Sequence, residues 1–348
     1  MSLYESVKDL PLEIEGYSLE GLELQARSDF LRRTTVVHLH GKGDEGIGED
    51  VTYHGDEHEF SQKLGPVFPL AGSWTLDSFS RHLATLPLFP QEPEQHAYWD
   101  YRRWAYDSAA LDLALRQAGR SLGEAVQREP RPVHFVVSMG LGSPPSTERF
   151  RSWLDLYPGL RFKLDANTEW SDELIEGLAA TGAVDSVDFK GQYRGTTVDS
   201  PPDAALYRRV AAGLPEAWLE DPGLTPETET VLDRHADRVT WDAIVHSVED
   251  IEGLRWPPKT VNVKPSRFGS VERLFAAYDY CEAQGIGAYG GGQWELGPGR
   301  GQIQLLASLF HPDTPNDVAP RDFNLAPKAG LPESPLEVEP RKSGFLSL

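Results

Sequence analysis

The feature of this 348-residue chain that most limits its fold is a repeat of short β-rich runs and helical segments between residues 134 and 310. The repeat occurs six or seven times, in units of roughly 20 to 30 residues. Strands that alternate with helices form a parallel sheet, because each helix returns the chain to the same end of the sheet. About 200 residues of this pattern after a separate α+β region favour a closed α/β barrel over an open sheet. The open parallel sheet is the alternative. The runs predicted as strands are His134–Met139, Leu160–Asp165, Val184–Lys190, Ala217–Glu220, Val239–Asp242, Thr260–Lys264 and Ile286–Gly290.

The first hundred residues have a mixed β and α pattern. Arg33–His40 is rich in β-branched residues and predicts a strand, followed by a glycine-rich turn over Gly41–Gly46. A second short strand is predicted near Val51–Tyr53. Apolar residues at helical spacing predict a helix from Tyr101 to about Val126.

A proline-containing segment at residues 127–133 breaks the helical pattern and predicts a domain boundary. We therefore expect residues 1–126 to form an α+β capping domain and residues 127–323 to form the barrel with the metal and catalytic residues. Residues 324–348 are rich in proline and are expected to run over the surface as a tail.

The charge of the chain limits its partners. It has 33 Lys and Arg against 54 Asp and Glu, a formal net charge of −21. Such a surface repels nucleic acid and anionic lipid, so neither is an expected partner. An anionic substrate would need local positive charge or a metal ion to bind.

Targeting signals and disulfides are also not expected. No run approaches the roughly 20 apolar residues that cross a bilayer, and the acidic N-terminus has no apolar signal region. Cys281 is the only cysteine, which excludes an internal disulfide and a thiolate zinc cluster. These features favour a cytoplasmic protein without a membrane association.

Ionisable or amide side chains end five consecutive predicted strands of the barrel. Residues two apart in a strand share a face, so each pair within a strand points the same way. Active sites of α/β barrels form at the C-terminal ends of the strands, which makes this series a candidate site. Its members are Lys163 and Asp165, Asp188 and Lys190, Glu220, Asp242, and Asn262 with Lys264.

Three of these residues, Asp188, Glu220 and Asp242, are carboxylates on neighbouring strands. Converging carboxylates repel one another unless a cation neutralises them or they take up protons. Hard oxygen ligands without histidine or cysteine favour Mg²⁺, with Mn²⁺ as the alternative, over zinc. Lys264 ends the next strand and Lys163 lies on the opposite side, where a lysine with a depressed pKa can act as a general base.

At these residues the chain resembles the enolase superfamily. The similarity rests on Asp188, Glu220 in Leu-Glu-Asp-Pro, Asp242, and Lys264 in Asn-Val-Lys-Pro-Ser, and from Glu220 onward each successive pair is 22 positions apart. The resemblance implies an α+β capping domain joined to a modified (β/α)7β barrel of the TIM type. It also implies Mg²⁺ on the three carboxylates and a Lys264 that removes the proton α to a substrate carboxylate.

Three positions depart from the family pattern. The second strand commonly ends Lys-x-Lys and here reads Lys163-Leu-Asp165, while the third reads Asp188-Phe-Lys190 and the fifth Asp242-Ala. These departures weigh against a two-lysine racemase or epimerase mechanism. Asp165-Ala-Asn is a rival for the first metal ligand, but it lies two strand–helix units before Glu220. The Lys190 ammonium is a second rival, since it could occupy the place of the metal and leave a metal-free site.

Further substrate contacts are expected outside the triad. The stretch Gly-Gly-Gly-Gln-Trp-Glu-Leu-Gly resembles the seventh strand of the superfamily and its following turn, which places Gln293 and Glu295 near the site. His54 lies in a capping-domain loop, together with His58, and is a further candidate for a substrate contact. Gly41-x-Gly-x-x-Gly46 matches a dinucleotide fingerprint, but no helical pattern follows it, so no organic cofactor is expected.

The sequence thus predicts a Mg²⁺-dependent lyase or isomerase acting on a small carboxylic acid. Lys264 is the expected base, and Asp165 or Lys163 the group that protonates a leaving group or polarises the substrate. One base opposite one acid favours a lyase, by β-elimination of the dehydratase or ammonia-lyase type. A cycloisomerase or epimerase is the alternative enzyme, and a non-catalytic barrel that binds an acidic metabolite is the alternative of another class. The oligomeric state is left open, a homo-oligomer included.

Overall fold

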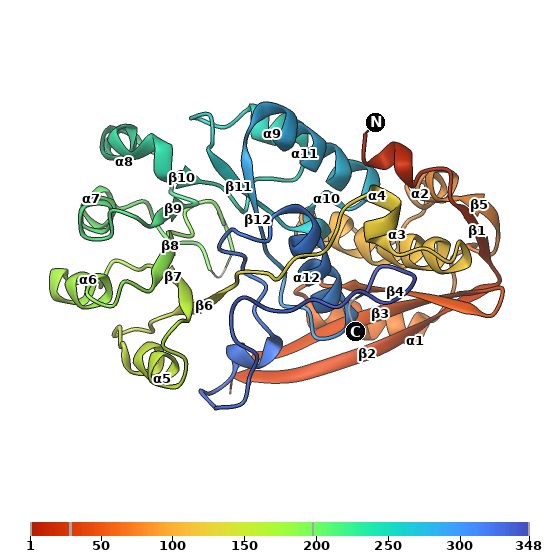
Figure 1. Ribbon diagram of the computed structural model, residues 1–348, viewed down its shortest axis with the longest axis horizontal. Helices are drawn as coiled ribbons and strands as arrows, with labels where there is room; N and C mark the ends of the chain where they lie inside the picture. Colours follow the sequence, from red (N-terminus) through yellow and green to blue (C-terminus); the bar gives the residue numbers. More distant parts are fainter. Residues whose placement is uncertain (1, 28–29, 197, 347–348) are drawn as a thin grey trace.

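A computed structural model describes residues 2–27, 30–196 and 198–346, and its central feature is a parallel sheet (Figure 1). The strands lie in the order β10-β9-β8-β7-β6, and each neighbouring pair is parallel. Their short apolar runs are buried, as expected for strands covered on both faces. The strands are β6 (Val136–Gly140), β7 (Arg161–Asp165), β8 (Val184–Asp188), β9 (Trp218–Glu220) and β10 (Val239–Thr240).

Backbone contacts continue from this sheet around a ring. The parallel pair β11 (Thr260–Val263) and β12 (Gly287–Gly290) follows β10, with Asn262 N donating to the Trp241 carbonyl at 2.9 Å. Parallel bridges then join Gly291 to Asp317, and Asn316 to Phe135 just before β6. The predicted fold class, an α/β barrel arrangement with an N-terminal β-containing domain, is confirmed.

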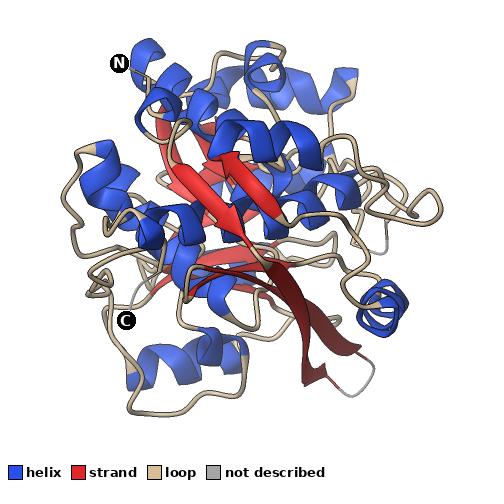
Figure 2. Ribbon diagram, turned by 90° about the vertical axis from the view of Figure 1, so that its right-hand side faces the viewer, coloured by secondary structure: helices blue, strands red, loops and turns tan. Residues whose placement is uncertain are grey.

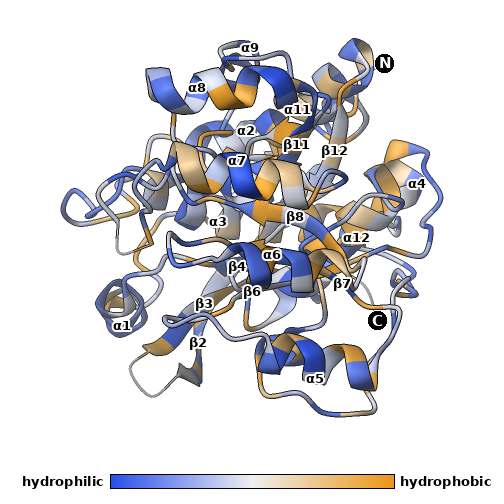
Figure 3. Cartoon of the chain, turned by 90° about the vertical axis from the view of Figure 1, so that its left-hand side faces the viewer, coloured by the Kyte–Doolittle hydropathy of each residue, from blue (hydrophilic) through white to orange (hydrophobic). Residues whose placement is uncertain are grey.

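A helix follows each of these strands and covers the outside of the sheet (Figure 1). Figure 3 shows hydrophilic and hydrophobic residues alternating along α5, α7 and α8, which is typical of helices with one buried face. Ser171, Thr225 and Ser270 cap their helices, each hydroxyl accepting a hydrogen bond from a backbone N–H three residues on. The helices are α5 (Glu148–Leu156), α6 (Asp172–Ala179), α7 (Ala204–Gly213), α8 (Pro226–Leu232), α9 (Val248–Glu252), α10 (Pro265–Phe268), α11 (Val271–Gln284) and α12 (Pro298–Phe310).

The N-terminal region packs an antiparallel sheet of order β2-β3-β4 against a long helix, α3 (Figure 2). Helix and sheet approach closely, because a Cβ at Gly48 would lie 2.0 Å from the Ala105 carbonyl oxygen. Glycine is therefore required at that position. The elements of this region are β1 (Pro11–Ile14), β2 (Gly16–Arg27), β3 (Phe30–Gly41), β4 (Asp44–Asp50), α1 (Gly55–Leu64), β5 (Gly72–Thr75), α2 (Leu76–Leu83), α3 (Ala97–Gln117) and α4 (Leu122–Val126).

Two buried charged residues of this cap contact the barrel loop at residues 293–299, and we call them the junction. Arg32 on β3 donates to the carbonyl oxygens of residues 51, 52, 293 and 294 at 2.6 to 3.2 Å. Glu49 on β4 accepts from the backbone N–H groups of Leu296, Gly297 and Gly299 at 2.7 to 3.1 Å. The side chains of the junction thus fix the loop that follows β12 next to the strand ends.

Several details of the predicted capping domain are wrong. Residues 51–53 are not a strand, because β4 starts earlier, at Asp44, and ends at Asp50. The turn before β4 is therefore confined to Lys42 and Gly43. The predicted helix to residue 126 is two helices, α3 and α4, separated where Gly119 adopts φ 65°. His54 occupies the N-cap position of helix α1, which begins at Gly55, and its side chain makes no capping hydrogen bond, whereas the sequence predicted a loop there.

The expectation that the tail runs over the surface is wrong at its end. Phe345 is fully buried, and its ring lies 6.3 Å from that of Trp104 on α3. Its backbone N–H donates to Asp112 at 2.6 Å, and Leu336 pairs with Val133 beside the barrel. The tail therefore joins the core of both parts of the molecule. Among the helices of the described residues, none is both long and apolar enough to cross a membrane.

Candidate active site

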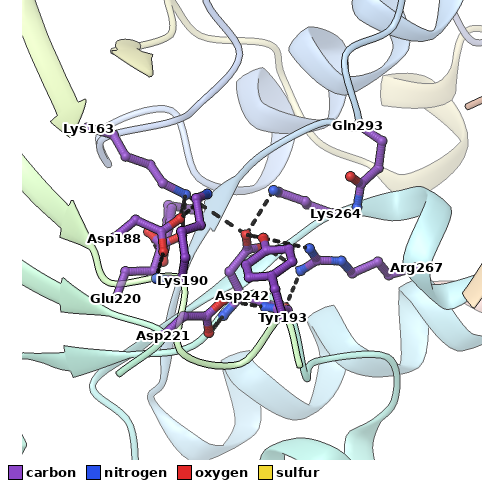
Figure 4. A network of polar contacts seen from close by, with 12 residues as sticks. Lys163, Asp188, Lys190, Tyr193, Glu220, Asp221, Asp242, Lys264, Arg267 and Gln293 are labelled. Carbon is purple, nitrogen blue, oxygen red and sulfur yellow. Dashed lines mark hydrogen bonds and ion pairs between the residues drawn. The ribbon is translucent and has the colours of Figure 1, made fainter. Parts of the chain in front are cut away.

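Three carboxylates meet at the C-terminal ends of β8, β9 and β10 (Figure 4). Asp188, Glu220 and Asp242 are completely buried, and each offers an oxygen within 4.8 Å of the others. Asp188 and Glu220 are register partners on adjacent parallel strands, and Asp242 lies two residues beyond β10. The structure therefore brings together the three residues predicted as metal ligands, which we call the triad.

Lys163, on β7, reaches all three carboxylates of the triad. Its ammonium donates to Glu220 and lies 3.3 Å from Asp188 and 3.9 Å from Asp242. Only 1% of the residue is exposed. Burial opposes the charge, but Glu220, Asp188 and Asp242 outweigh it and raise the pKa of Lys163 well above its ordinary value. Lys163 is thus a buried cation of the triad.

Lys190 follows β8 and binds Asp188 twice. Its backbone N–H donates to Asp188 Oδ1 at 2.9 Å and its ammonium to Oδ2 at 2.5 Å. The same ammonium lies 3.3 Å from Asp165 Oδ1, so Lys190 bridges the ends of β7 and β8. Lys190 adopts φ 53°, a left-handed conformation that costs on the order of 1–3 kcal/mol for a residue other than glycine. Burial, opposed by Lys190, raises the pKa of Asp165.

Asp242 binds a second group of cations on the other side of the triad. Lys264 donates to its Oδ2 at 2.8 Å and Arg267 to its Oδ1 at 2.5 Å. The Tyr193 hydroxyl adds a hydrogen bond at 3.0 Å and accepts one from Arg267 at 3.2 Å. Burial would raise the pKa of Asp242, but Arg267, Lys264 and Lys163 hold it well below its ordinary value.

Lys264 lies directly after β11 and is 5% exposed. Burial lowers the pKa of its ammonium, and Arg267 and Lys163 lower it further, while Asp242 opposes them. Gly291 makes room for this side chain, because a Cβ there would come within 2.6 Å of Lys264 Cε. The geometry and the direction of the pKa shift both suit a lysine that accepts a proton.

The carboxylate of Asp221 holds the end of β10 in place. It follows β9 with φ 47°, and its two oxygens accept the backbone N–H groups of Asp242 and Ala243 at 2.8 Å each. Burial, reinforced by the charges of Asp242, Asp188 and Glu220, raises the pKa of Asp221 to about 8. Burial, opposed by Lys163, raises that of Glu220 to about 7.

The predicted substrate-binding residues lie at different distances from the triad. Gln293 follows Gly291, whose backbone lies against Lys264, by two residues, and it donates to Tyr101 at 3.0 Å and accepts from Tyr53 at 3.2 Å. Glu295 accepts the N–H of residue 293 at 2.7 Å and so supports the Gln293 loop. His54 is exposed at the start of α1 and is not brought into the cluster.

Comparison with known proteins places the chain in a family. Family models described as the N-terminal and C-terminal domains of a domain of unknown function, DUF8230, match residues 5–125 and 129–325. The chain belongs to the DUF8230 family. This DUF8230 chain is also 25% identical over 228 residues to an N-succinylamino acid racemase from Amycolatopsis, an alignment that covers 63% of the chain and only 60% of the racemase.

Solved structures show that this DUF8230 protein has the enolase-superfamily fold. A dipeptide epimerase from Methylococcus capsulatus, crystallised with Mg ion, matches with a TM-score of 0.69 and 18% identity, covering 97% of this chain and 99% of the epimerase. An enolase-superfamily member from Listeria innocua matches with a TM-score of 0.64 and 17% identity over 89% of this chain and 86% of its own. The predicted resemblance to this superfamily is confirmed at the level of the fold. The prediction of an enzyme agrees with the names of the racemase and the epimerase.

The triad of this DUF8230 protein fits a divalent cation in ligand type and spacing. Three buried carboxylates supply hard oxygen donors, as Mg²⁺ and Mn²⁺ prefer. Nearby, the Asn262 side chain on β11 is completely buried, and neither its amide nitrogen nor its oxygen has a hydrogen-bond partner. A buried amide without a partner indicates a group that contacts a bound molecule or water.

Sequence reasoning missed three residues of this site in the DUF8230 chain. Arg267 lies in the same stretch as Lys264, three residues on, and that proximity was a usable signal. Asp221 directly follows the predicted ligand Glu220, and this adjacency in the sequence was a second usable signal. Tyr193 comes from the irregular segment between β8 and α7, which has no periodic pattern to place it.

Proposed function

We propose that this chain is a metal-dependent enzyme that removes the proton α to the carboxylate of a small acid. The observation that carries the proposal is the position of Lys264, a buried amine 2.8 Å from one carboxylate of the triad. A base beside a metal site suits α-proton abstraction, since the ion and the base can then act on adjacent atoms of one substrate. The related racemase and epimerase support the same chemistry.

In this proposal Asp188, Glu220 and Asp242 hold the ion, with Mg²⁺ as the expected metal and Mn²⁺ as the alternative. The ion would supply Lewis-acid stabilisation of the negative charge that develops when the proton leaves. Lys264 Nζ accepts that proton and is kept in position by Asp242. Asn262 and Gln293, on the same side as Lys264, are the proposed contacts of the rest of the substrate.

The outcome of proton removal depends on the opposite side of the triad. There Asp165 lies beside Lys190 at the end of β7, with 36% of its side chain exposed. In a lyase, Asp165 gives its proton to a leaving group on the β carbon, and the product contains a new double bond. In an isomerase, which the names of the racemase and the epimerase favour, a proton returns to the α carbon. The lyase is our first candidate because Asp165 replaces the second lysine, and the isomerase is our second.

The test is α-proton exchange in D₂O, followed by proton NMR, with Mg²⁺ and a panel of N-acyl amino acids, dipeptides and β-substituted acids. Wild type should exchange the α proton of at least one acid, and Lys264→Ala should lose about 10²- to 10⁴-fold of the rate. Lys259→Ala is the matched control, because Lys259 is exposed and pairs with Asp237. A new vinyl signal identifies the lyase, and inversion at the α carbon identifies the isomerase. Metal and ligand binding without exchange in any acid would contradict an enzyme and favour a binding barrel.

A further inference from the structure

The triad already has a cation of its own. Of the side chains around it, Lys163 is the one whose ammonium contacts all three carboxylates, with a hydrogen bond to Glu220 and approaches of 3.3 and 3.9 Å to Asp188 and Asp242. Lys190, which the sequence suggested as the occupant of the metal's place, contacts only Asp188 within the triad. Among the described residues, Lys163 is therefore the one placed where an ion shared by the three carboxylates would act.

The surrounding hydrogen bonds complete this arrangement. Each of the six carboxylate oxygens of the triad accepts a hydrogen bond from the protein. Ser186 and Tyr289 supply the donors to Glu220 Oε2 at 3.2 and 2.9 Å. The other donors come from Lys163, Lys190, Lys264, Arg267 and Tyr193.

Charges around the triad are close to balanced before any ion is added. Four cations, Lys163, Lys190, Lys264 and Arg267, face the five carboxylates Asp165, Asp188, Glu220, Asp221 and Asp242. A divalent ion binds carboxylate oxygens at about 2.0 to 2.6 Å, so it would lie close to an ammonium that bonds to the same carboxylates. Repulsion between like charges is strong in a buried site, where little water screens it.

We propose that Lys163 is the resident counter-cation of the triad and that a divalent ion binds only when its ammonium withdraws from Glu220. This inference rests on the proposed function, since it takes the triad as the metal site. Lys163 has a flexible four-carbon stem, so its ammonium can move away from Glu220 when an ion competes for the carboxylates. The competition between the Lys163 ammonium and the divalent ion for the same carboxylates then sets the metal affinity of the protein.

The experiment is calorimetric titration of MgCl₂ into the full chain, for wild type, Lys163→Met and Lys190→Met. Lys163→Met removes the competing charge and keeps an unbranched chain, so it should bind Mg²⁺ at least about ten-fold more tightly than wild type. Lys190→Met removes an ammonium that touches one triad carboxylate and should change the affinity less.

A melting experiment covers the case in which Lys163→Met is unstable without metal. The variant should melt at a lower temperature than wild type in EDTA and recover with Mg²⁺, while wild type gains little, because ligands stabilise the state they bind. Lys163→Gln, which keeps a hydrogen-bond donor but no charge, should behave in the same way. A lysine with only a structural role would give a loss of melting temperature that Mg²⁺ does not restore.

Two outcomes contradict the inference, and only the second of them also contradicts the proposed function. If wild type binds Mg²⁺ and folded Lys163→Met binds it equally or more weakly, the lysine is no competitor, and the proposed function stands. If wild type and the folded lysine variants all fail to bind Mg²⁺ and Mn²⁺, the triad is no metal site, and the proposed function fails as well.

Discussion

The triad and the junction both bury charged side chains near the same end of the barrel, but they neutralise them differently. The triad sets carboxylates against lysine and arginine side chains. The junction sets Arg32 against four carbonyl oxygens and Glu49 against three backbone N–H groups. Backbone dipoles are fixed by the fold, whereas side-chain charges move with their rotamers. The junction is therefore suited to hold a loop, and the triad to exchange partners with an ion or a substrate.

The two regions also differ in the kind of buried group that a single substitution leaves without a partner. Removing one member of a buried ion pair leaves an uncompensated charge and costs about 3–5 kcal/mol. Removing a charge that is bound to backbone groups leaves unsatisfied dipoles, at roughly 1–3 kcal/mol for each buried group that water does not reach. Three substitutions, in order of expected effect, test this difference.

Asp242→Asn should have the largest effect. It removes the carboxylate that binds Lys264, Arg267 and Tyr193, and it leaves the positive charges of the lysine and the arginine buried without their partner. We expect the free energy of unfolding in urea to fall by about 3–5 kcal/mol. We also expect Mg²⁺ binding to disappear. Asp237→Asn, at an exposed pair with Lys259, is the control and should change stability little. A variant as stable as wild type would show that the buried charges of Lys264 and Arg267 do not need the Asp242 carboxylate to neutralise them.

Arg32→Met should have an intermediate effect confined to the junction. It removes donors to the four carbonyl oxygens and so breaks one of the links between the cap and the loop after β12. We expect a loss of roughly 2–4 kcal/mol in urea unfolding. The Mg²⁺ affinity should be nearly unchanged, since the triad keeps all its ligands. A large loss of affinity would mean that the two regions are coupled through residues 293–294.

Glu49→Gln should have the smallest effect, visible mainly as a change in pH dependence. Burial, reinforced by Glu295, raises the pKa of Glu49 above its ordinary value, so the folded state holds a proton more tightly than the unfolded state. The contribution of this proton uptake to the free energy of unfolding is then complete below the ordinary glutamate pKa, and it is lost as the pH rises through the raised pKa of Glu49. Wild type should gain stability relative to Glu49→Gln as the pH falls through the raised pKa towards the ordinary value of about 4.5. Urea unfolding midpoints that change with pH by the same amount in both proteins would contradict this prediction.

Much of the triad was predictable because strand ends of a parallel barrel converge. The 22-residue spacing of Glu220, Asp242 and Lys264 places them on successive strands without knowledge of any side-chain conformation. The position of Lys163 was not predictable in the same way. Both Lys163 and Lys190 fit the strand-end pattern. The backbone conformation after β8, with Lys190 at φ 53°, keeps the Lys190 ammonium on Asp188, so that Lys163 is the lysine in contact with all three carboxylates.

The junction lay beyond sequence reasoning for a different reason. Arg32 and Gln293 are separated by 261 residues, and the contact is to a backbone carbonyl, which leaves no trace in residue types. His54 was predicted in a loop, yet helix α1 begins directly after it, because a glycine at the first helical position is tolerated when the following residues, here through Leu64, propagate the helix. Loop and cap geometry depends on such long-range contacts, whereas the barrel follows from local periodicity.

The buried end of the tail has a consequence for the order in which the protein matures during translation. Phe345 contacts Asp112 on α3 across 233 residues of intervening chain. At about 5–20 residues per second, a ribosome needs roughly 10 to 50 s to synthesise that interval, during which α3 lacks its final packing partner. Helix α3 is therefore synthesised well before the packing that Phe345 supplies can form.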